Sequence, residues 1–293
     1  TTDWAAPYRA QRIVELIESK PQLSPEDFAA IQGDVHPVPT DIFTPLLEPV
    51  DLAGGSAAVQ QARAALLAWN RQMAADSAEP LIFELYQQKL ISETLGDEIV
   101  AAGGEELAAA YLSGFRNNST QAVQRLTAEP DNIWWDDVRT PAVERRDDIV
   151  ARALTLAVAE LQGRFGDNAA RWRWGDAHWT NFDHLVFAAV SPLDGIFNRS
   201  IPAMGSSFTV NAAGVDYDDL TMNSGASFRQ IIDLGDLNAS QFIYTTGQSG
   251  NVFSPHYDDM VQPWQGVQYI PLRFDQADIQ QTAQETLVLQ PAA

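Results

Sequence analysis

Glycine and proline residues restrict the backbone conformation of residues 244–274. Gly247 and Gly250 bracket a Gln-Ser pair, and glycine tolerates the positive φ that a tight reversal requires. Pro255 fixes its own φ and holds Ser254 in an extended conformation. The segment then ends in an apolar run. This pattern predicts a loop of special geometry between two strands, in which no lone nucleophile has a base beside it.

Apolar residues at helical spacing dominate the first part of the chain. In residues 3–20, Ile13, Leu16 and Ile17 predict a helix with a buried stripe. Ser24 predicts the capped start of a second helix. Further helical patterns cover residues 41–126 and 143–165.

Strand patterns follow in the second part of the chain. Residues 226–234 alternate between two faces, as in a β-strand, and residues 286–289 are typical of a last strand. This order predicts an α+β fold. We expect a mainly helical part over residues 1–165 and a strand-rich part of the same domain over residues 166–293.

Composition excludes several classes of function. The formal net charge of −21 disfavours nucleic-acid binding, because the chain would repel phosphate backbones. The absence of cysteine excludes a disulfide framework and a thiolate zinc site. No apolar run approaches the roughly 20 residues that span a bilayer. The hydrophobic content of 45% instead predicts a domain with a packed core.

Paired polar residues offer few candidates for chemistry on their own. His36 lies close to Asp34 but has no second histidine nearby, so we do not expect it to bind metal. His178 and His184 are six residues apart and would not share a helix face. The adjacent acids at 136–137 point apart in a turn, which disfavours a catalytic carboxylate pair.

Short motifs distributed along the chain carry a family resemblance. They resemble, in the same order, motifs of the penicillin acylase (penicillin amidase) family of N-terminal nucleophile hydrolases, over nearly the whole of residues 3–274. The motifs are PYRAQRI (7–13), KPQLSPEDF (20–28), IWWDD (133–137), WRWG (172–175) with His178 and His184, FNRSIPAMGSSFTVN (197–211), ASFRQIIDL (226–234), GQSG (247–250) and SPHY (254–257).

Two departures from the family pattern are small. Gly205-Ser206 stands where the family usually has Gly-Gly, and Thr245-Thr246 stands where it usually has Pro-Gly or similar. We expect each change to affect one turn.

The resemblance implies both a fold and an activity. Family members have a four-layer αββα fold and cleave amides through an acyl-enzyme. Their substrates include penicillins, cephalosporin side chains and acyl-homoserine lactones, so the resemblance implies a role in antibiotic metabolism or quorum quenching. It identifies this chain as a fragment, the C-terminal half of the nucleophile-bearing β chain. Its partners would be a small-molecule amide, the α chain and the missing N-terminal part of the β chain.

The resemblance places most of the catalytic apparatus outside this chain. The family uses the hydroxyl of its own first residue as nucleophile and the free α-amine as base. Thr1 does not fit that role, because the motif beginning at Pro7 leaves no room for the first strands of the nucleophile sheet. The family's oxyanion asparagine precedes the arginine motif, whereas the first asparagine here is Asn70. We therefore expect the chain alone to be inactive.

Arg9 is the recognised catalytic-site residue that the resemblance leaves in this chain. In the family, the matching arginine of PYRA.RI reaches back to the active-site asparagine and helps hold the oxyanion region. On the residues alone, Arg9 is equally well a surface charge on a helix. The resemblance also implies a structural calcium ion, bound mostly by upstream residues, with Asp3 as its one ligand here. A helix-capping role for Asp3 stays open. No organic cofactor is implied.

The family resemblance also bears on the location of the protein, and one alternative function departs from the family's activity. The resemblance implies a periplasmic or secreted bacterial protein. The alternative function is a non-catalytic, calcium-dependent binding or scaffold protein that keeps the fold, suggested by the missing nucleophile and the large negative charge.

Overall fold

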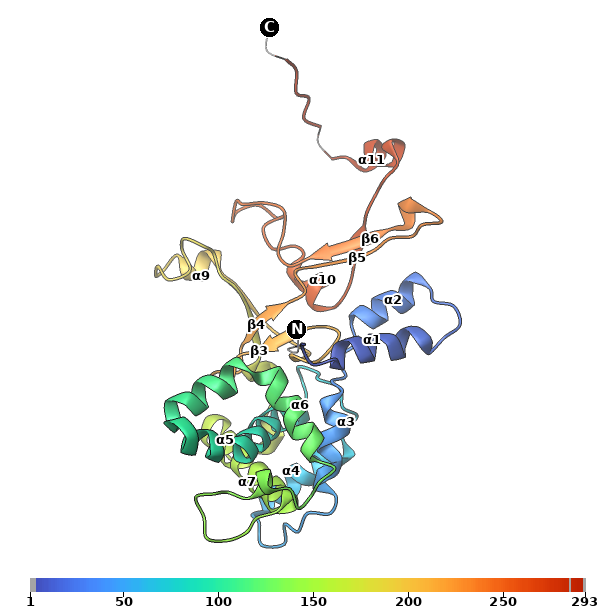
Figure 1. The fold of residues 1–293 in the computed structure, drawn as a ribbon. Helices are drawn as coiled ribbons and strands as arrows, with labels where there is room; N and C mark the ends of the chain where they lie inside the picture. Colours follow the sequence, from blue (N-terminus) through green and yellow to red (C-terminus); the bar gives the residue numbers. More distant parts are fainter. Residues whose placement is uncertain (1–3, 285, 292–293) are drawn as a thin grey trace. The chain divides into compact units, whose positions relative to one another are not determined.

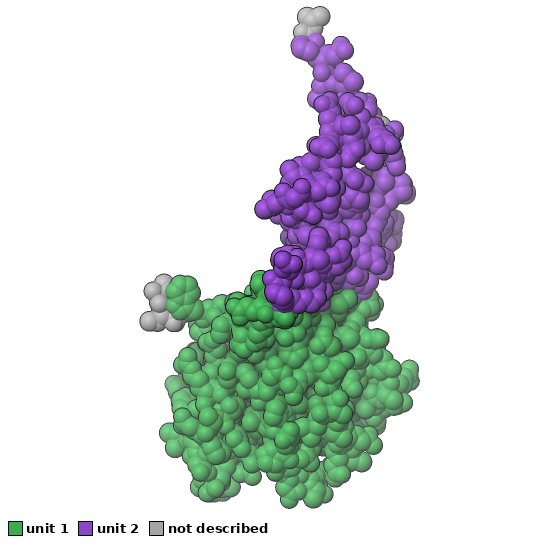
Figure 2. Space-filling view, turned by 90° about the vertical axis from the view of Figure 1, so that its right-hand side faces the viewer, with its two compact units in different colours: residues 1–19, 34–181, 200–225 green, residues 20–33, 182–199, 226–293 purple. Residues whose placement is uncertain are grey.

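The structure is a computed structural model that describes residues 4–284 and 286–291. The chain forms two compact units, each built from three segments (Figure 2). Unit 1 comprises residues 1–19, 34–181 and 200–225, and unit 2 comprises residues 20–33, 182–199 and 226–293. Each unit therefore combines segments from the first and the second part of the chain. The predicted division at residue 165 follows the change in secondary structure and stays a prediction.

Unit 1 is mainly helical. Its longer helices are α1 (Tyr8–Glu18), α4 (Ala57–Ala68), α5 (Glu79–Gly114), α6 (Arg116–Leu126) and α7 (Arg146–Phe165). Its short helical turns are α3 (Pro39–Phe43), η1 (Thr44–Leu47), η2 (Ile133–Trp135), η3 (Ala169–Arg171) and α8 (Trp174–Ala177).

The core of unit 1 lies where α5 and α7 pack along each other (Figure 1). Leu81 and Leu85 on α5 and Leu154 and Leu161 on α7 are completely buried, and Trp135 of η2 is buried in the same cluster. Each such side chain contributes about 1.5–3 kcal/mol by leaving water. Trp135 of the IWWDD motif is thus held by the packing of α5 and α7.

Helix α5 is bent within its length. Gly104 has a φ of 84° and a ψ of 174°, a conformation that side chains other than glycine rarely adopt. After this bend, Leu112 lies 4.0 Å from the position that a Cβ on Gly96 would occupy. The second piece of α5 thus folds back toward the first.

A four-stranded sheet completes unit 1. Its strands are β1 (Trp179–Phe182), β2 (Arg199–Pro202), β3 (Ala213–Val215) and β4 (Met222–Gly225), in the order β2-β1-β4-β3. Strands β3 and β4 are antiparallel, with Gly214 opposite Ser224, whereas β1 and β4 are parallel, with Thr180 opposite Met222.

Unit 2 contains a three-stranded antiparallel sheet in the order β5-β6-β7. Arg229 and Ile231 of β5 are buried, and Phe228 on the opposite face is exposed, as the alternating pattern predicts. The elements of this unit are α2 (Pro25–Gln32), α9 (Asp194–Phe197), β5 (Phe228–Ile231), η4 (Leu237–Ala239), β6 (Gln241–Tyr244), α10 (Val261–Gln265), β7 (Ile270–Pro271) and α11 (Gln276–Thr282).

Several local predictions can be compared directly with the structure. Ser24 caps α2, and its side chain accepts a hydrogen bond from the backbone of Asp27. The predicted buried stripe on α1 is wrong, since Ile17 is 42% exposed and Tyr8 is the buried residue of that helix. Residues 286–289 contain no strand, contrary to prediction. Within the described residues, no helix has the length and apolar character needed to cross a membrane.

Candidate functional site

The motif PYRAQRI begins at the N-terminus of α1, where a buried tyrosine holds the first turn. The ring of Tyr8 packs edge-on against Phe208, with 5.3 Å between ring centroids. Its hydroxyl donates a hydrogen bond to Oε1 of Gln124 on α6 at 2.5 Å. Burial raises the pKa of Tyr8 to about 12. The hydroxyl therefore stays protonated at neutral pH and remains available as a donor.

The second arginine of the motif, Arg12, forms the principal ion pair of α1. Its Nε and Nη2 donate to Oδ1 and Oδ2 of Asp34, at 3.2 Å and 2.8 Å. Asp34 Oδ1 also accepts the backbone N–H of His36 at 3.2 Å. The hydrogen bonds to Asp34 raise the pKa of Arg12. This two-pronged contact fixes the guanidinium in one orientation.

The residue that the resemblance placed in the catalytic site, Arg9, lies on the exposed surface of α1. Among the residues that the structure describes, no hydrogen bond or ion pair to Arg9 is formed. Its catalytic role stays a prediction. Asp3, the predicted calcium ligand, lies outside the described residues.

The carbonyl of Asp34 connects α1 to a hydrogen-bonded centre made from later motifs. It accepts the N–H of Asn211 at 2.9 Å. Gly205 has a φ of 88°, and a Cβ there would lie 2.5 Å from the carbonyl oxygen of Asn211. The indole Nε1 of Trp174 donates to the Gly205 carbonyl at 2.9 Å. Glycine is therefore required at 205.

Ser206, the departure from the family's Gly-Gly, is accommodated within this centre. Its φ is not positive, so a side chain causes no backbone strain. Its N–H donates to Oγ1 of Thr209 at 2.9 Å. Ser206 and Thr209 thus belong to the same turn.

His178 lies in the same unit and is completely buried. Its ring stacks on Trp174 with 4.3 Å between centroids, and Nδ1 lies 2.7 Å from the carbonyl oxygen of Leu220. Burial lowers the pKa of His178 to about 4, so the ring is neutral at physiological pH. Nδ1 must then carry the proton that it donates to Leu220. The residue packs the core beside α8.

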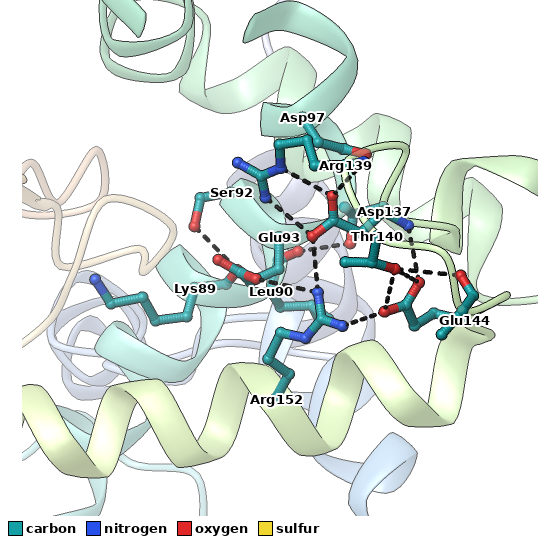
Figure 3. Close-up of polar contacts among 12 residues, drawn as sticks. Lys89, Leu90, Ser92, Glu93, Asp97, Asp137, Arg139, Thr140, Glu144 and Arg152 are labelled. Atoms are coloured by element: carbon teal, nitrogen blue, oxygen red, sulfur yellow. Dashed lines mark hydrogen bonds and ion pairs between the residues drawn. The ribbon is translucent and has the colours of Figure 1, made fainter. Parts of the chain in front are cut away.

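A charged network surrounds the IWWDD motif and joins it to α5 and α7 (Figure 3). Asp137 is buried and accepts hydrogen bonds from Nε and Nη2 of Arg139, at 2.8 Å and 3.0 Å, and from Nη1 of Arg152 at 3.0 Å. Arg152 also contacts Glu144 at 2.5 Å. The hydrogen bond from Arg139 is the main cause that lowers the pKa of Asp137 to about 2.

The protonation state of Asp137 bears on whether Asp136 and Asp137 act in catalysis or in structure. A carboxylate with such a low pKa stays ionised and cannot serve as a general acid near neutral pH. Asp136 instead accepts the backbone N–H of Glu144 at 2.9 Å. Asp137 thus joins this segment to α7, and Asp136 braces residues 136–144 internally. That the two acids are not a catalytic pair stays a prediction.

Two further acids, Asp97 and Glu98, lie at the edge of the network. Asp97 Oδ2 accepts the backbone N–H of Val138 at 2.7 Å. Loss of hydration raises the pKa of Glu98 to about 8, with a further contribution from its hydrogen bond to Asp97. Glu98 is therefore largely protonated at neutral pH.

In unit 2, residues 245–269 connect β6 to β7, so a connection between two strands is present as predicted; it contains the short helix α10, and β7 itself lies within the predicted segment 244–274. Gly247 and Gly250 do not have positive φ values, so that part of the prediction is wrong. Gly247 is needed for a different reason: a Cβ there would lie 2.2 Å from the carbonyl oxygen of His256. The two halves of the loop are thus in close backbone contact, and Ser249 N–H donates to the same carbonyl at 3.0 Å.

Metal binding has little support from the side chains in the described ranges. Within these ranges, no group of three or more His, Cys, Asp or Glu residues is arranged to hold a metal ion. His36 lies 2.8 Å from Asp41 and forms an ion pair with it when protonated. The calcium ion that the resemblance implies, with Asp3 as its one ligand here, stays a prediction.

The sequence is similar to one protein family and to acylases of that family. The profile of the family described as penicillin amidase matches residues 1–281. An acyl-homoserine lactone acylase, QuiP, from Pseudomonas syringae pv. tomato is 30% identical over 294 residues, covering 94% of this chain and 35% of the relative. Penicillin acylase 2 proenzyme from a Pseudomonas species, strain SE83, is 27% identical and covers 99% of this chain and 36% of the relative.

A solved structure shares the fold. The thermostable penicillin G acylase from Alcaligenes faecalis superposes with a TM-score of 0.60 at 19% identity, covering 97% of this chain and 52% of that chain. This likeness confirms the predicted fold class. The chain spans about a third of the length of the curated relatives it matches.

The sequence pattern does not predict the ion pair that anchors α1. The motif points to Arg9, whereas the structure pairs Arg12 with Asp34, 22 residues further along the chain. In the sequence, Asp34 stands out only as a neighbour of His36. A second arginine one helical turn after a buried tyrosine was the available signal, because such residues lie on the same helix face.

Proposed function

The chain belongs to the penicillin amidase family, and we propose that it forms part of an enzyme that hydrolyses an acyl-amide bond through an acyl-enzyme. The observation that carries this proposal is the family match, which extends over residues 1–281. Two of the motifs are also connected in unit 1, where Trp174 and Asn211 belong to one hydrogen-bonded centre with Asp34.

We propose that the nucleophile and its oxyanion donor come from polypeptide outside these 293 residues. The curated relatives are about three times as long as the part of them that this chain matches, which leaves room for both groups. This chain would contribute the helical support and the cation of Arg9. A guanidinium is charged at every physiological pH. Held near a developing oxyanion or its asparagine donor, that charge would stabilise the transition state.

The proposed substrates are amides with a removable acyl group. The relatives' names point to two classes, acyl-homoserine lactones and penicillins. We favour the acyl-homoserine lactone class, because two relatives named for it are 30% identical to this chain, against 27% for the penicillin acylase. The residues that would separate the two classes by shape are not assigned in this chain.

The proposal is tested by comparing the complete protein with the 293-residue chain. Each is incubated with an N-acyl-homoserine lactone and with penicillin G, and the released amine is measured by chromatography. We expect hydrolysis by the complete protein and none by the chain alone. An active isolated chain would overturn the assignment of the nucleophile. A folded complete protein that cleaves neither amide would contradict the proposed activity.

Two accompanying proposals follow from the family rather than from this chain's contacts. They are a structural calcium ion in the complete protein and a periplasmic or secreted location. Calcium is tested by the melting temperature of the complete protein before and after chelation, with calcium and magnesium added back separately. Location is tested by fractionating the producing cells. An unchanged melting temperature or a purely cytoplasmic protein would count against the respective proposal.

A further inference from the structure

Helix α1 is attached to unit 1 by few contacts, and these are concentrated at its start. Tyr8 is the buried residue of the helix, while Val14 and Ile17 on the later turns are exposed. Arg12 supplies the other long-range side-chain anchor, through Asp34. The orientation of α1 therefore depends on two side chains one turn apart rather than on a broad apolar face.

The two anchors determine where Arg9 points. Residues four apart lie on the same helix face, so Tyr8 and Arg12 attach α1 along one line. Successive residues are rotated by about 100°, which places Arg9 about 60° from Arg12 around the helix axis. With Tyr8 alone, the helix could turn about that single contact. With the fork of Arg12 on both oxygens of Asp34, the rotation of the helix is fixed, and so is the direction of Arg9.

Charge supports the same arrangement. Arg9 and Arg12 are three residues apart, a spacing at which like charges repel on a helix. Asp34 lies within 2.8 Å of the Arg12 guanidinium and compensates its charge. Arg9 has no such partner among the described residues, so its charge stays available to a group outside this chain.

We propose that Arg12, held by Asp34, is a positioning residue that fixes the direction of Arg9. The inference rests on the proposed function, because it gives Arg9 a target in the complete enzyme. Arg12 itself does not touch the substrate in this account. It acts through α1, and its planar fork is the feature that lysine cannot reproduce.

A double-mutant cycle in the complete protein tests this inference. The variants are Arg9→Met, Arg12→Met and the double variant, and the measured quantities are kcat, KM and melting temperature. We expect each single substitution to lower kcat by about tenfold or more with little change in KM, since small misplacements of a site residue are costly. The double variant should have the kcat of Arg9→Met alone, because Arg12 then has nothing to position.

Two controls separate positioning from general stability. Arg164→Met removes another arginine of unit 1, which pairs with Glu160 at 3.2 Å and donates to the carbonyl of Asp219. It should lower the melting temperature and leave kcat unchanged. Arg12→Lys keeps the charge without the fork and should give a kcat between those of the wild type and Arg12→Met. It also provides a folded variant if Arg12→Met does not fold.

A second measurement is independent of activity. The 293 residues contain no cysteine, so in the complete protein, with any cysteine outside them replaced by serine, Arg9→Cys accepts a single spin label. Adding Arg12→Met should shorten the rotational correlation time of the label by about twofold, whereas adding Arg164→Met should not. Equal mobility in all three proteins would overturn the positioning role, even if no amide substrate is found.

The kinetic outcomes also distinguish the claims. If Arg12→Met lowers kcat equally with and without Arg9, the two residues act independently and the inference fails. If Arg9→Met leaves kcat unchanged in an active enzyme, both the site role of Arg9 and the positioning role of Arg12 are refuted. A wild-type protein without amidase activity contradicts the proposed function alone, and the spin-label result then decides the positioning claim.

Discussion

Acidification should weaken this fold through a single buried histidine, His178. Its pKa in the folded chain is about 4, against 6.5 for an ordinary histidine, because burial disfavours the charged ring. Between these two values the unfolded chain binds a proton that the folded chain does not. The stabilisation is therefore complete above about pH 6.5 and is lost progressively as the pH falls to about 4.

The size of the effect follows from the shift. A displacement from 6.5 to about 4 corresponds to a maximum loss of about 3 kcal/mol, at about 1.4 kcal/mol per pH unit. Between pH 7 and pH 5 the expected loss from His178 is about 2 kcal/mol. Carboxylates add their own pH dependence, so the contribution of the histidine must be obtained by difference.

The assay is urea unfolding at pH 7, 6 and 5 for the wild type and for His178→Gln. The variant should be less stable at pH 7, because it loses the stacking on Trp174. From pH 7 to pH 5 its free energy of unfolding should fall by about 2 kcal/mol less than that of the wild type. Thr94→Val is the control. Thr94 is buried and donates to the Leu90 carbonyl, so its loss destabilises the fold without removing a titrating group. Identical slopes for the wild type and His178→Gln would refute the reasoning.

Three further predictions concern other parts of the fold. Asp137→Asn should lower the free energy of unfolding by about 1–2 kcal/mol, because the charged hydrogen bonds to Arg139 and Arg152 are weakened while Arg152 keeps Glu144 as a partner; chemical denaturation measures the loss, and a change below about 0.5 kcal/mol would contradict the role of the network. Gly247→Ala should destabilise unit 2, since the new Cβ would lie 2.2 Å from a backbone oxygen; hydrogen exchange of β6 should accelerate, and unchanged exchange would argue against the close contact. Glu98 has a raised pKa of about 8, so the stability it provides is complete below about pH 4.5 and is lost as the pH rises to about 8; Glu98→Gln should flatten this decline between pH 4.5 and 8 in thermal unfolding, and a parallel decline would exclude Glu98 as its source.

Local patterns in the sequence predicted those features that depend on neighbouring residues. The cap at Ser24, the alternation of β5 and the loop between β6 and β7 all follow from short-range geometry, and the structure confirms them. The order of the motifs indicated the family, because many short patterns occurring in one order are more specific than any one of them alone. The family match over residues 1–281 confirms that resemblance.

The predictions that failed depend on distant parts of the chain. Helical spacing gave α1 an apolar stripe, but periodicity does not determine whether another element covers it, and Ile17 is exposed. Gly247 was assigned a positive φ, whereas the actual constraint is the approach of a backbone segment nine residues away.

Arg12 and Asp34 are likewise far apart in the sequence, and no local pattern predicts that they form an ion pair. The family motif points to Arg9, whose proposed partner lies outside these 293 residues. The structure adds the residue that holds the helix, and this could not be obtained from the motif alone.

The most direct test of the central claim is to trap the acyl-enzyme. The complete protein is mixed with an N-acyl-homoserine lactone, quenched with acid within the first turnover and digested for mass spectrometry. Our account predicts an acyl adduct on a peptide outside these 293 residues and none within them. An adduct on a residue of this chain, or full hydrolysis without any covalent intermediate, would contradict the account.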